Sequence, residues 1–147
     1  NTAHYFYDRL AEALPVPVLN MPRLTVPMLG GRLHKLGILA TDGTLAAETY
    51  QLACQTQGID WAVPSEEHQQ EVMSVIYDDI KQGKRADMAK FGAAVHDLKK
   101  QGCDMAVLGC TELSLVKRTS TGKFFIDSTE VLCRHALEAC GVKPIGF

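Results

Sequence analysis

The chain has 147 residues, enough for one domain or two small lobes with a buried core, so its size does not require disulfides. Its formal net charge of -2 argues against a nucleic-acid surface, and no apolar run is long enough to predict membrane contact. Five cysteines lack the spacings of zinc sites, which predicts no metal and a reducing, cytoplasmic setting.

The first thirty-one residues predict a helix followed by an irregular connection. Asn1 and Thr2 are good helix-capping residues, and apolar side chains then recur at helical spacing as far as Pro15. We interpret this as the helix of a βα unit whose strand comes earlier, so we expect the chain to begin inside a larger unit. Residues 17–20 predict a short strand, and the prolines and glycines up to residue 31 predict a hinge or crossover holding one weak helix.

Strands then alternate with helices along the rest of the chain. The expected strands are residues 36–40, 59–63, 105–108 and 124–127. Five helices are expected between and after these strands. The first ends at Gly58, the second extends from Ser65 to Gly83, and the third runs through residues 88–98. The fourth begins near Thr111, and the fifth extends from about Thr129 to Gly141. This alternation predicts an α/β fold with a parallel sheet and βαβ crossovers.

The most informative stretch is residues 105–112. Its buried strand ends at Gly109, and a thiol, a hydroxyl and a carboxylate follow at Cys110, Thr111 and Glu112. Open α/β sheets bind ligands at the carboxyl ends of their strands, so these side chains are candidates for chemistry. A helix beginning at Thr111 would favour the thiolate form of Cys110. Composition alone favours the alternative, a buried structural cysteine.

Other polar turns and single residues carry weaker signals. The hydroxyls and N–H groups of residues 41–44 could hold a carboxylate or phosphate, although such a turn more often caps a helix. Capping is the better interpretation for residues 127–129. Most of the five histidines are expected to be surface or capping residues, and His4 is the one near a candidate site. Lys81 ends an amphipathic helix, where lysine commonly serves only the helix dipole.

Two polar turns are similar to each other. Asn1 and Thr2 precede a helix, as Cys110 and Thr111 do. Two such turns facing one another across a cleft would form a pseudo-symmetric site.

Five segments form a longer pattern in fixed order: residues 1–4, 36–44 with Tyr50, 76–83, 108–112 and 126–129. In that order they resemble the aspartate/glutamate racemase family of cofactor-independent amino-acid racemases, over essentially the whole chain. The resemblance implies an α/β fold of two Rossmann-like lobes of parallel sheet, related by pseudo-twofold symmetry, with the active site between them. It also implies a homodimer and a small amino-acid substrate, with no cofactor, no nucleic acid and no membrane.

The resemblance divides the chain into three parts. Residues 1–31 would be the remainder of an incomplete first lobe, and residues 32–120 would be the second lobe, which carries Cys110. Residues 121–147 would supply a strand and a helix that return to the first lobe. Pro27, with the glycines after it, departs from the more regular segment expected between lobes.

The family chemistry removes the α-proton of aspartate or glutamate on one face and returns a proton on the other. Two cysteines, one per lobe, act as thiolate base and thiol acid, without metal or pyridoxal phosphate. The resemblance makes Cys110 the second-lobe acid/base. It places Asn1, Thr2, Thr41, Thr44 and Thr111 around the α-carboxylate and amino groups, Glu112 beside Cys110 or the ammonium group, and Lys81 on the side-chain carboxylate.

In the family, the first catalytic cysteine stands immediately before the segment that matches residues 1–4. We therefore expect a cysteine before Asn1 in a longer polypeptide, preceded by a further part of the first lobe with an arginine that recognises the side-chain carboxylate. We expect the present segment alone to be inactive.

Aspartate is the favoured substrate and glutamate the next. A second possibility keeps the scaffold and changes the substrate, as in hydantoin racemases, maleate isomerases and arylmalonate decarboxylases, although Glu112 after Cys110 and Thr111 favours the aspartate branch. A third is a non-catalytic amino-acid-binding protein. A cysteine before Asn1 would favour racemisation, and an apolar residue there would favour binding alone. A threonine there would leave one strong base and favour turnover biased toward one enantiomer.

Overall fold

The computed structural model describes residues 2–31, 33–117 and 123–146, and a four-stranded sheet lies at its centre. The strands are β1 (Lys35–Leu39), β2 (Asp60–Ala62), β3 (Met105–Leu108) and β4 (Phe125–Asp127). They lie in the order β2-β1-β3-β4, and each neighbouring pair is parallel. The predicted α/β class with a parallel sheet is therefore confirmed.

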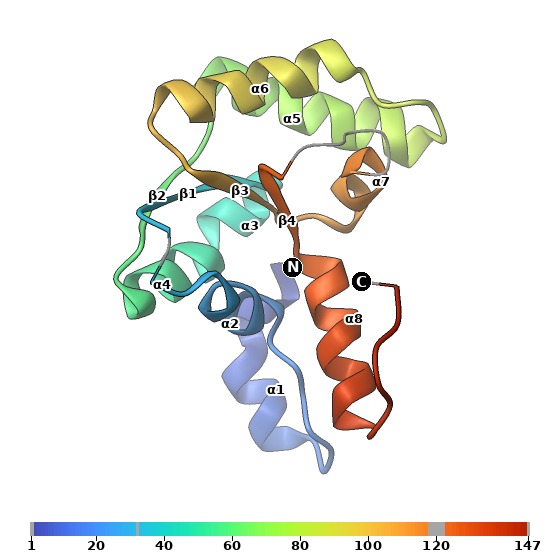
Figure 1. The fold of residues 1–147 in the computed structure, drawn as a ribbon. Helices are drawn as coiled ribbons and strands as arrows, with labels where there is room; N and C mark the ends of the chain where they lie inside the picture. The colour runs from blue at the N-terminus through green and yellow to red at the C-terminus, as the bar shows by residue number, and fades with distance from the viewer. Residues whose placement is uncertain (1, 32, 118–122, 147) are drawn as a thin grey trace.

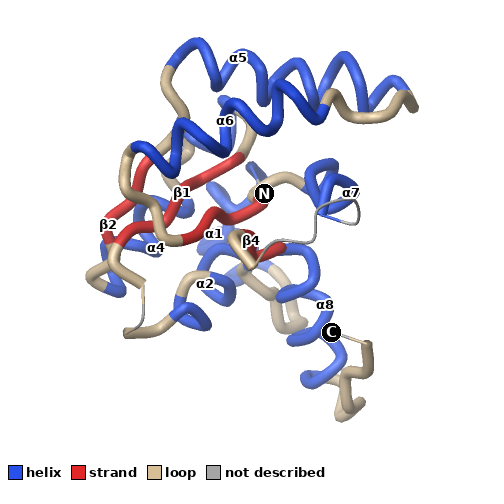
Figure 2. The backbone as a smooth tube through the Cα atoms, turned by 45° about the horizontal axis from the view of Figure 1, so that its top comes forward, coloured by secondary structure: helices blue, strands red, loops and turns tan. Residues whose placement is uncertain are grey.

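Helices cover both faces of this sheet (Figure 1, Figure 2). On one face lie α5 (Glu66–Ser74) and α6 (Met88–Lys100), and on the other lie α2 (Met21–Thr25) and α4 (Thr49–Gln57). The remaining elements are η1 (Thr2–Phe6), α1 (Tyr7–Ala13), η2 (Pro27–Leu29), α3 (Asp42–Ala46), η3 (Val75–Asp79), η4 (Ile80–Gln82), η5 (Thr111–Leu113), α7 (Ser114–Lys117) and α8 (Ser128–Ala139).

Alternate residues of the strands pack against opposite helical layers, as the period of two in a strand requires. Leu36 and Ile38 of β1 belong to the apolar cluster beside α4, whereas Leu39 belongs to the cluster beneath α5 and α6. Because both faces of the sheet are covered, its central strands β1 and β3 are apolar almost throughout. Helix α6 packs so closely on β1 that a Cβ at Gly37 would lie 2.8 Å from Cδ1 of Leu98.

The strand predicted for residues 17–20 is wrong. Within the part of the chain that the structure describes, this segment pairs with no strand. Pro17 has no backbone donor for a ladder, and the side chain of Asn20 caps the start of α2 instead. The carbonyl of Val18 accepts a hydrogen bond from the Tyr7 hydroxyl at 3.0 Å, so a side chain replaces the missing strand partner.

The helix predicted to end at Gly58 is two helices. The break falls at Glu48, which has left-handed backbone with φ of 52° and separates α3 from α4. The side-chain amide of Gln51 donates to the carbonyl of Leu45 at 2.8 Å and so satisfies an acceptor at the end of α3. The next predicted helix also departs from regular form, because α5 continues into the π turn η3 and the 3-10 turn η4 before it ends at Gly83.

The C-terminal part of the chain contacts two regions. Strand β4 pairs with β3 and so extends the sheet of residues 32–120, whereas α8 packs against α2. The division into residues 1–31, 32–120 and 121–147, like the pseudo-twofold relation between lobes, stays a prediction. Among the described residues, no helix is both long enough and apolar enough to cross a membrane.

Candidate active site

The strand order creates a switch point between β1 and β3. From β1 the chain goes out to β2 at one edge, and then crosses back to β3 on the other side of β1. Ligands of open α/β sheets bind where connections diverge in this way, beyond the carboxyl ends of the strands. Leu39 pairs in register with Leu108, so Thr41 and Cys110 occupy equivalent places just past the ends of β1 and β3.

Three threonine hydroxyls meet at the end of β1. Thr41 caps α3, because its Oγ1 accepts a hydrogen bond from the Thr44 amide at 3.4 Å. The hydroxyl of Thr44 lies 3.1 Å from that of Thr41 and 3.0 Å from that of Thr2, which comes from η1. The structure therefore brings together three of the predicted substrate-binding side chains, two of them 42 residues apart in the chain.

Cys110 follows β3 and is largely buried, with 8% of its surface exposed. Its thiol donates a hydrogen bond to Oε2 of Glu112 at 2.8 Å, and the Thr111 hydroxyl donates to the same oxygen at 3.0 Å. The predicted contact between Glu112 and Cys110 is thus present in the structure. The carboxylate holds the thiol in one orientation.

The protonation of this pair differs from the sequence-based expectation of a thiolate. Burial, together with the hydrogen bond and charge of Glu112, raises the pKa of the Cys110 thiol to about 11. Burial alone would raise the pKa of Glu112, but hydrogen bonds from Cys110, its own backbone and Thr111, with the charge of Lys81, lower it overall. The helix expected to stabilise a thiolate begins as the 3-residue 3-10 turn η5, so its dipole is weak. The resting pair is therefore a neutral thiol beside a carboxylate.

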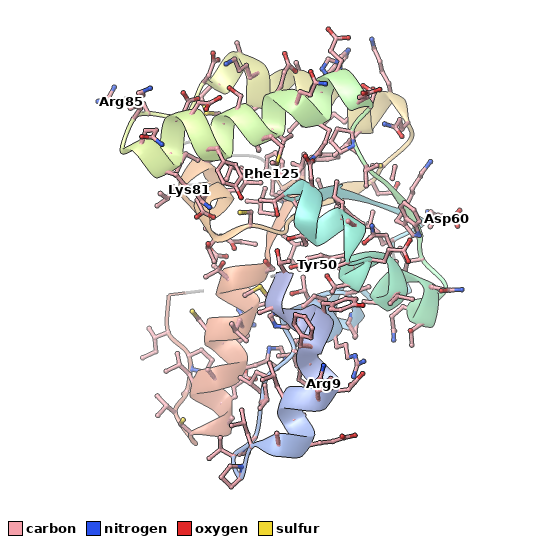
Figure 3. All side chains as sticks on the ribbon, turned by 180° about the vertical axis from the view of Figure 1, so that it is seen from behind. Arg9, Tyr50, Asp60, Lys81, Arg85 and Phe125 are labelled. Atoms are coloured by element: carbon pink, nitrogen blue, oxygen red, sulfur yellow. The ribbon has the colours of Figure 1, made fainter. Side chains whose placement is uncertain are left out.

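Lys81 reaches this pair from the turn that follows α5, on the face of the sheet where Cys110 also packs. It lies in η4, after the π turn, and its Nζ is 3.8 Å from Oε1 of Glu112. The same ammonium lies 4.1 Å from the centre of the Tyr77 ring, a cation–π distance. Figure 3 shows Lys81 at the end of its helix, with its side chain directed toward the middle of the molecule. Lys81 thus does more than serve a helix dipole.

The predicted site residues form two groups at adjacent strand ends. Thr2 joins Thr41 and Thr44, while the second group is Cys110, Thr111, Glu112 and Lys81. Asn1 lies outside the described residues. The sequence interpretation gave Tyr50 and Ser128 no part in the site, although both are fully buried next to the end of β3.

The capping interpretation of residues 127–129 is confirmed, and His4 also holds the start of a helix. Nε2 of His4 accepts a hydrogen bond from the Met21 amide, the first residue of α2, at 3.0 Å. The carboxylate of Asp127 accepts from the Thr129 amide at 2.9 Å at the start of α8, and from the Ser114 hydroxyl at 2.9 Å. These two residues therefore stabilise helix starts.

A cleft of about 750 Å³ lies elsewhere, among η1, α1, α2 and the α3–α4 connection. Its charged groups include Asp8 and Arg23, which pair with each other at 3.0 Å. None of the predicted site residues that the structure describes lines it. We place the chemistry at the strand ends, because the thiol, the carboxylate and the ammonium group converge there.

Comparison with known proteins identifies the family. The profile of the Asp/Glu/hydantoin racemase family matches residues 1–136. The chain belongs to this family.

Three individual proteins show how similar the chain is to known ones. The chain is 36% identical over 109 residues to an uncharacterized protein of Pectobacterium carotovorum, with 71% of each chain covered. It is 26% identical to the broad specificity amino-acid racemase RacX of Bacillus subtilis, over 79% of this chain and 51% of that protein. The fold matches the crystal structure of an aspartate racemase homologue from Pyrococcus horikoshii with a TM-score of 0.81 at 24% identity, over 96% of this chain and 64% of that one. The chain therefore spans about half the length of RacX and less than two thirds of the solved structure.

Proposed function

We propose that the protein racemises a small acidic amino acid, aspartate first and glutamate next, by proton transfer at the α-carbon without a cofactor. The observation that carries this proposal is the placement of the Cys110 thiol at the sheet switch point, hydrogen-bonded to Glu112 at 2.8 Å. Family membership supports the reaction class, and the similarity to the amino-acid racemase RacX supports an amino-acid substrate.

Cys110 serves as the acid in the resting state, because its proton is held on sulfur. A base on the other face removes the α-proton, and Cys110 then donates its own proton to the α-carbon, leaving a thiolate. In the reverse direction this thiolate removes the α-proton and the partner base returns one. The partner that we propose is a cysteine immediately before Asn1 in a longer polypeptide, so the present segment alone would be inactive.

The hydroxyl groups act on the α-carboxylate of the substrate. When the α-proton leaves, negative charge moves onto this carboxylate, and hydrogen-bond donors already in place stabilise it. Thr2, Thr41 and Thr44 supply such donors from one side. Thr111, whose hydroxyl donates to Glu112 in the structure, is proposed to turn from Glu112 to the substrate on the other side, and Asn1 is proposed to join them. Each of the three hydroxyls at the end of β1 lies within hydrogen-bonding distance of another, which fixes their orientation.

Lys81 is proposed to bind the side-chain carboxylate of the substrate. Its ammonium is 3.8 Å from Glu112, a contact long enough for a second carboxylate to compete for it. We further propose a homodimer in the cytoplasm, with no nucleic-acid partner.

The proposal is tested by incubating the full-length protein with L-aspartate or L-glutamate in D₂O and measuring α-deuterium by NMR and enantiomers by chiral chromatography. We expect exchange and racemisation with aspartate, weaker activity with glutamate, and neither with Cys110→Ala. The matched control is Cys133→Ala, which alters an exposed cysteine on α8 and should keep full activity. Substantial racemisation by Cys110→Ala would overturn the mechanism. Aspartate binding without exchange in the unaltered protein would instead support the binding-protein alternative.

A further inference from the structure

Tyr50 is fully buried in α4, and its ring packs against the backbone that leads to Cys110. A Cβ at Gly109 would lie 3.0 Å from Cε2 of Tyr50 and 3.1 Å from Cβ of Ala40. The backbone of Gly109 is therefore held between the tyrosine ring and the end of β1. Figure 3 shows Tyr50 near the centre of the molecule.

The hydroxyl of Tyr50 makes a second connection to the same strand end. It hydrogen-bonds to the side chain of Ser128, which is also fully buried. The Ser128 hydroxyl donates a hydrogen bond, through its one proton, to the carbonyl oxygen of Leu108 at 2.7 Å. Because that proton is used, the Tyr50 hydroxyl is the donor to Ser128. A hydrogen-bonded chain thus leads from α4, through the start of α8, to the last residue of β3.

A buried hydroxyl costs free energy unless it is hydrogen-bonded, and phenylalanine would fill nearly the same volume without this requirement. Burial raises the pKa of the Tyr50 phenol far above its ordinary value, and the charge of Asp127 adds to this effect. The phenol therefore stays a neutral donor. Its effect on the site is one of position.

We infer that Tyr50 and Ser128 are positioning residues for Cys110: together they fix the Leu108–Gly109 peptide, and so the direction from which the thiol meets the α-carbon. This inference rests on the proposed function for its catalytic consequence. The geometry at the end of β3 stands independently of that function.

The test compares Tyr50→Phe with Tyr7→Phe in the full-length protein. Tyr7→Phe is a matched control, because it also removes a hydrogen-bonded tyrosine hydroxyl, which donates to the Val18 carbonyl at 3.0 Å. For Tyr50→Phe we expect kcat for α-proton exchange to fall about tenfold with KM within about twofold, since small misplacement of a reacting group is costly. Tyr7→Phe should leave both kinetic parameters unchanged.

A second readout does not depend on the reaction. The rate at which iodoacetamide alkylates Cys110, followed by peptide mass spectrometry, should rise severalfold in Tyr50→Phe and stay constant in Tyr7→Phe. Cys54 is buried on α4 one turn beyond Tyr50, and its alkylation reports general loosening of that helix. We expect it to stay unchanged.

The outcomes separate the two proposals. Absence of exchange in the unaltered protein would overturn the proposed function, whereas the alkylation rates would still test the positioning role. Equal alkylation of Cys110 in both variants, or a matching rise at Cys54, would overturn the positioning role. If Tyr50→Phe does not fold, Ser128→Ala interrupts the same hydrogen-bonded chain and is judged by the same readouts.

Discussion

The thiol of Cys110 donates a hydrogen bond to Oε2 of Glu112 at 2.8 Å. Burial and this carboxylate together raise the pKa of the thiol to about 11, so the proton stays on sulfur near neutral pH. The same contact fixes the thiol in orientation. Glu112 therefore determines both the direction and the protonation of the group that we propose to exchange protons with the substrate.

Replacing Glu112 by glutamine should lower the pKa of Cys110. Glutamine keeps the size of the side chain and removes the negative charge that disfavours a thiolate. The midpoint of thiolate formation, followed by the alkylation rate of Cys110 against pH, should move down from about 11 toward the ordinary range. Glu66→Gln, in the first turn of α5, should leave the midpoint unchanged. An unchanged midpoint in Glu112→Gln would show that burial alone sets it.

Lys81→Ala should weaken binding of the substrate more than it slows turnover. Loss of a charge-assisted contact to a carboxylate costs about 1.5–3 kcal/mol, which predicts a rise in KM for aspartate of about tenfold or more. The control is Lys84→Ala. The Lys84 ammonium donates to the Asp78 carbonyl at 3.0 Å, and its removal should leave KM unchanged. Equal KM values for the two variants would remove Lys81 from the binding site.

The alternation of apolar strands with capped helices predicted the class of fold correctly, because each signal lies within a few residues. The π turn of η3 was not predicted, since residues 75–79 show an ordinary helical pattern and the wider turn depends on packing. The same holds for Glu48, whose left-handed backbone no local residue preference indicates. These two irregularities decide where α4 begins and where Lys81 lies.

The site shows the same limit. Cys110, Thr111 and Glu112 are adjacent in the sequence, so their contact could be predicted from a turn at a strand end. The hydrogen bond between Tyr50 and Ser128 could not, because its partners come from distant helices that meet only when the sheet is assembled. The direction of the thiol pKa was also wrong, because burial and the nearby carboxylate outweigh a short helix.

The buried thiol of Cys54 should make the protein less stable at alkaline pH. Burial raises the pKa of its thiol to about 11, above the value of about 8.5 in an unfolded chain. Its contribution to stability is therefore complete below about pH 8.5 and is lost as the pH rises toward 11.

The free energy of unfolding in urea should fall between neutral and alkaline pH in both proteins. The fall should be about 1–2 kcal/mol smaller in Cys54→Ala than in the unaltered protein, with partial solvent screening taken into account. Cys133→Ala removes an exposed thiol and should retain the full pH dependence. Parallel curves for all three proteins would contradict this role of Cys54.

Thr44→Val should uncouple η1 from the end of β1. The Thr44 hydroxyl lies 3.0 Å from that of Thr2 and 3.1 Å from that of Thr41, so valine removes both contacts while keeping the shape. We expect a loss of about 1–2 kcal/mol in the free energy of unfolding and a higher KM. Thr44→Ser keeps the hydroxyl and should retain most of both properties. If serine and valine behave alike, the hydroxyl has no part in the site.

Gly109→Ala should have the opposite effect on stability from Gly92→Ala. At Gly109 a new Cβ would meet Tyr50 at 3.0 Å and Ala40 at 3.1 Å, so we expect a loss of about 1–3 kcal/mol from overpacking. At Gly92, in the interior of α6, a new Cβ meets nothing within 4 Å, and alanine should stabilise the helix by about 0.5–1 kcal/mol.

Urea unfolding measures the change in stability of each variant. The rate of α-deuterium exchange shows whether a shift of the backbone at Gly109 also displaces the Cys110 thiol. Only Gly109→Ala should slow exchange, because Gly109 alone of the two glycines is bonded to Cys110. A stable Gly109→Ala variant with normal exchange would show that the end of β3 can move without consequence for the reaction.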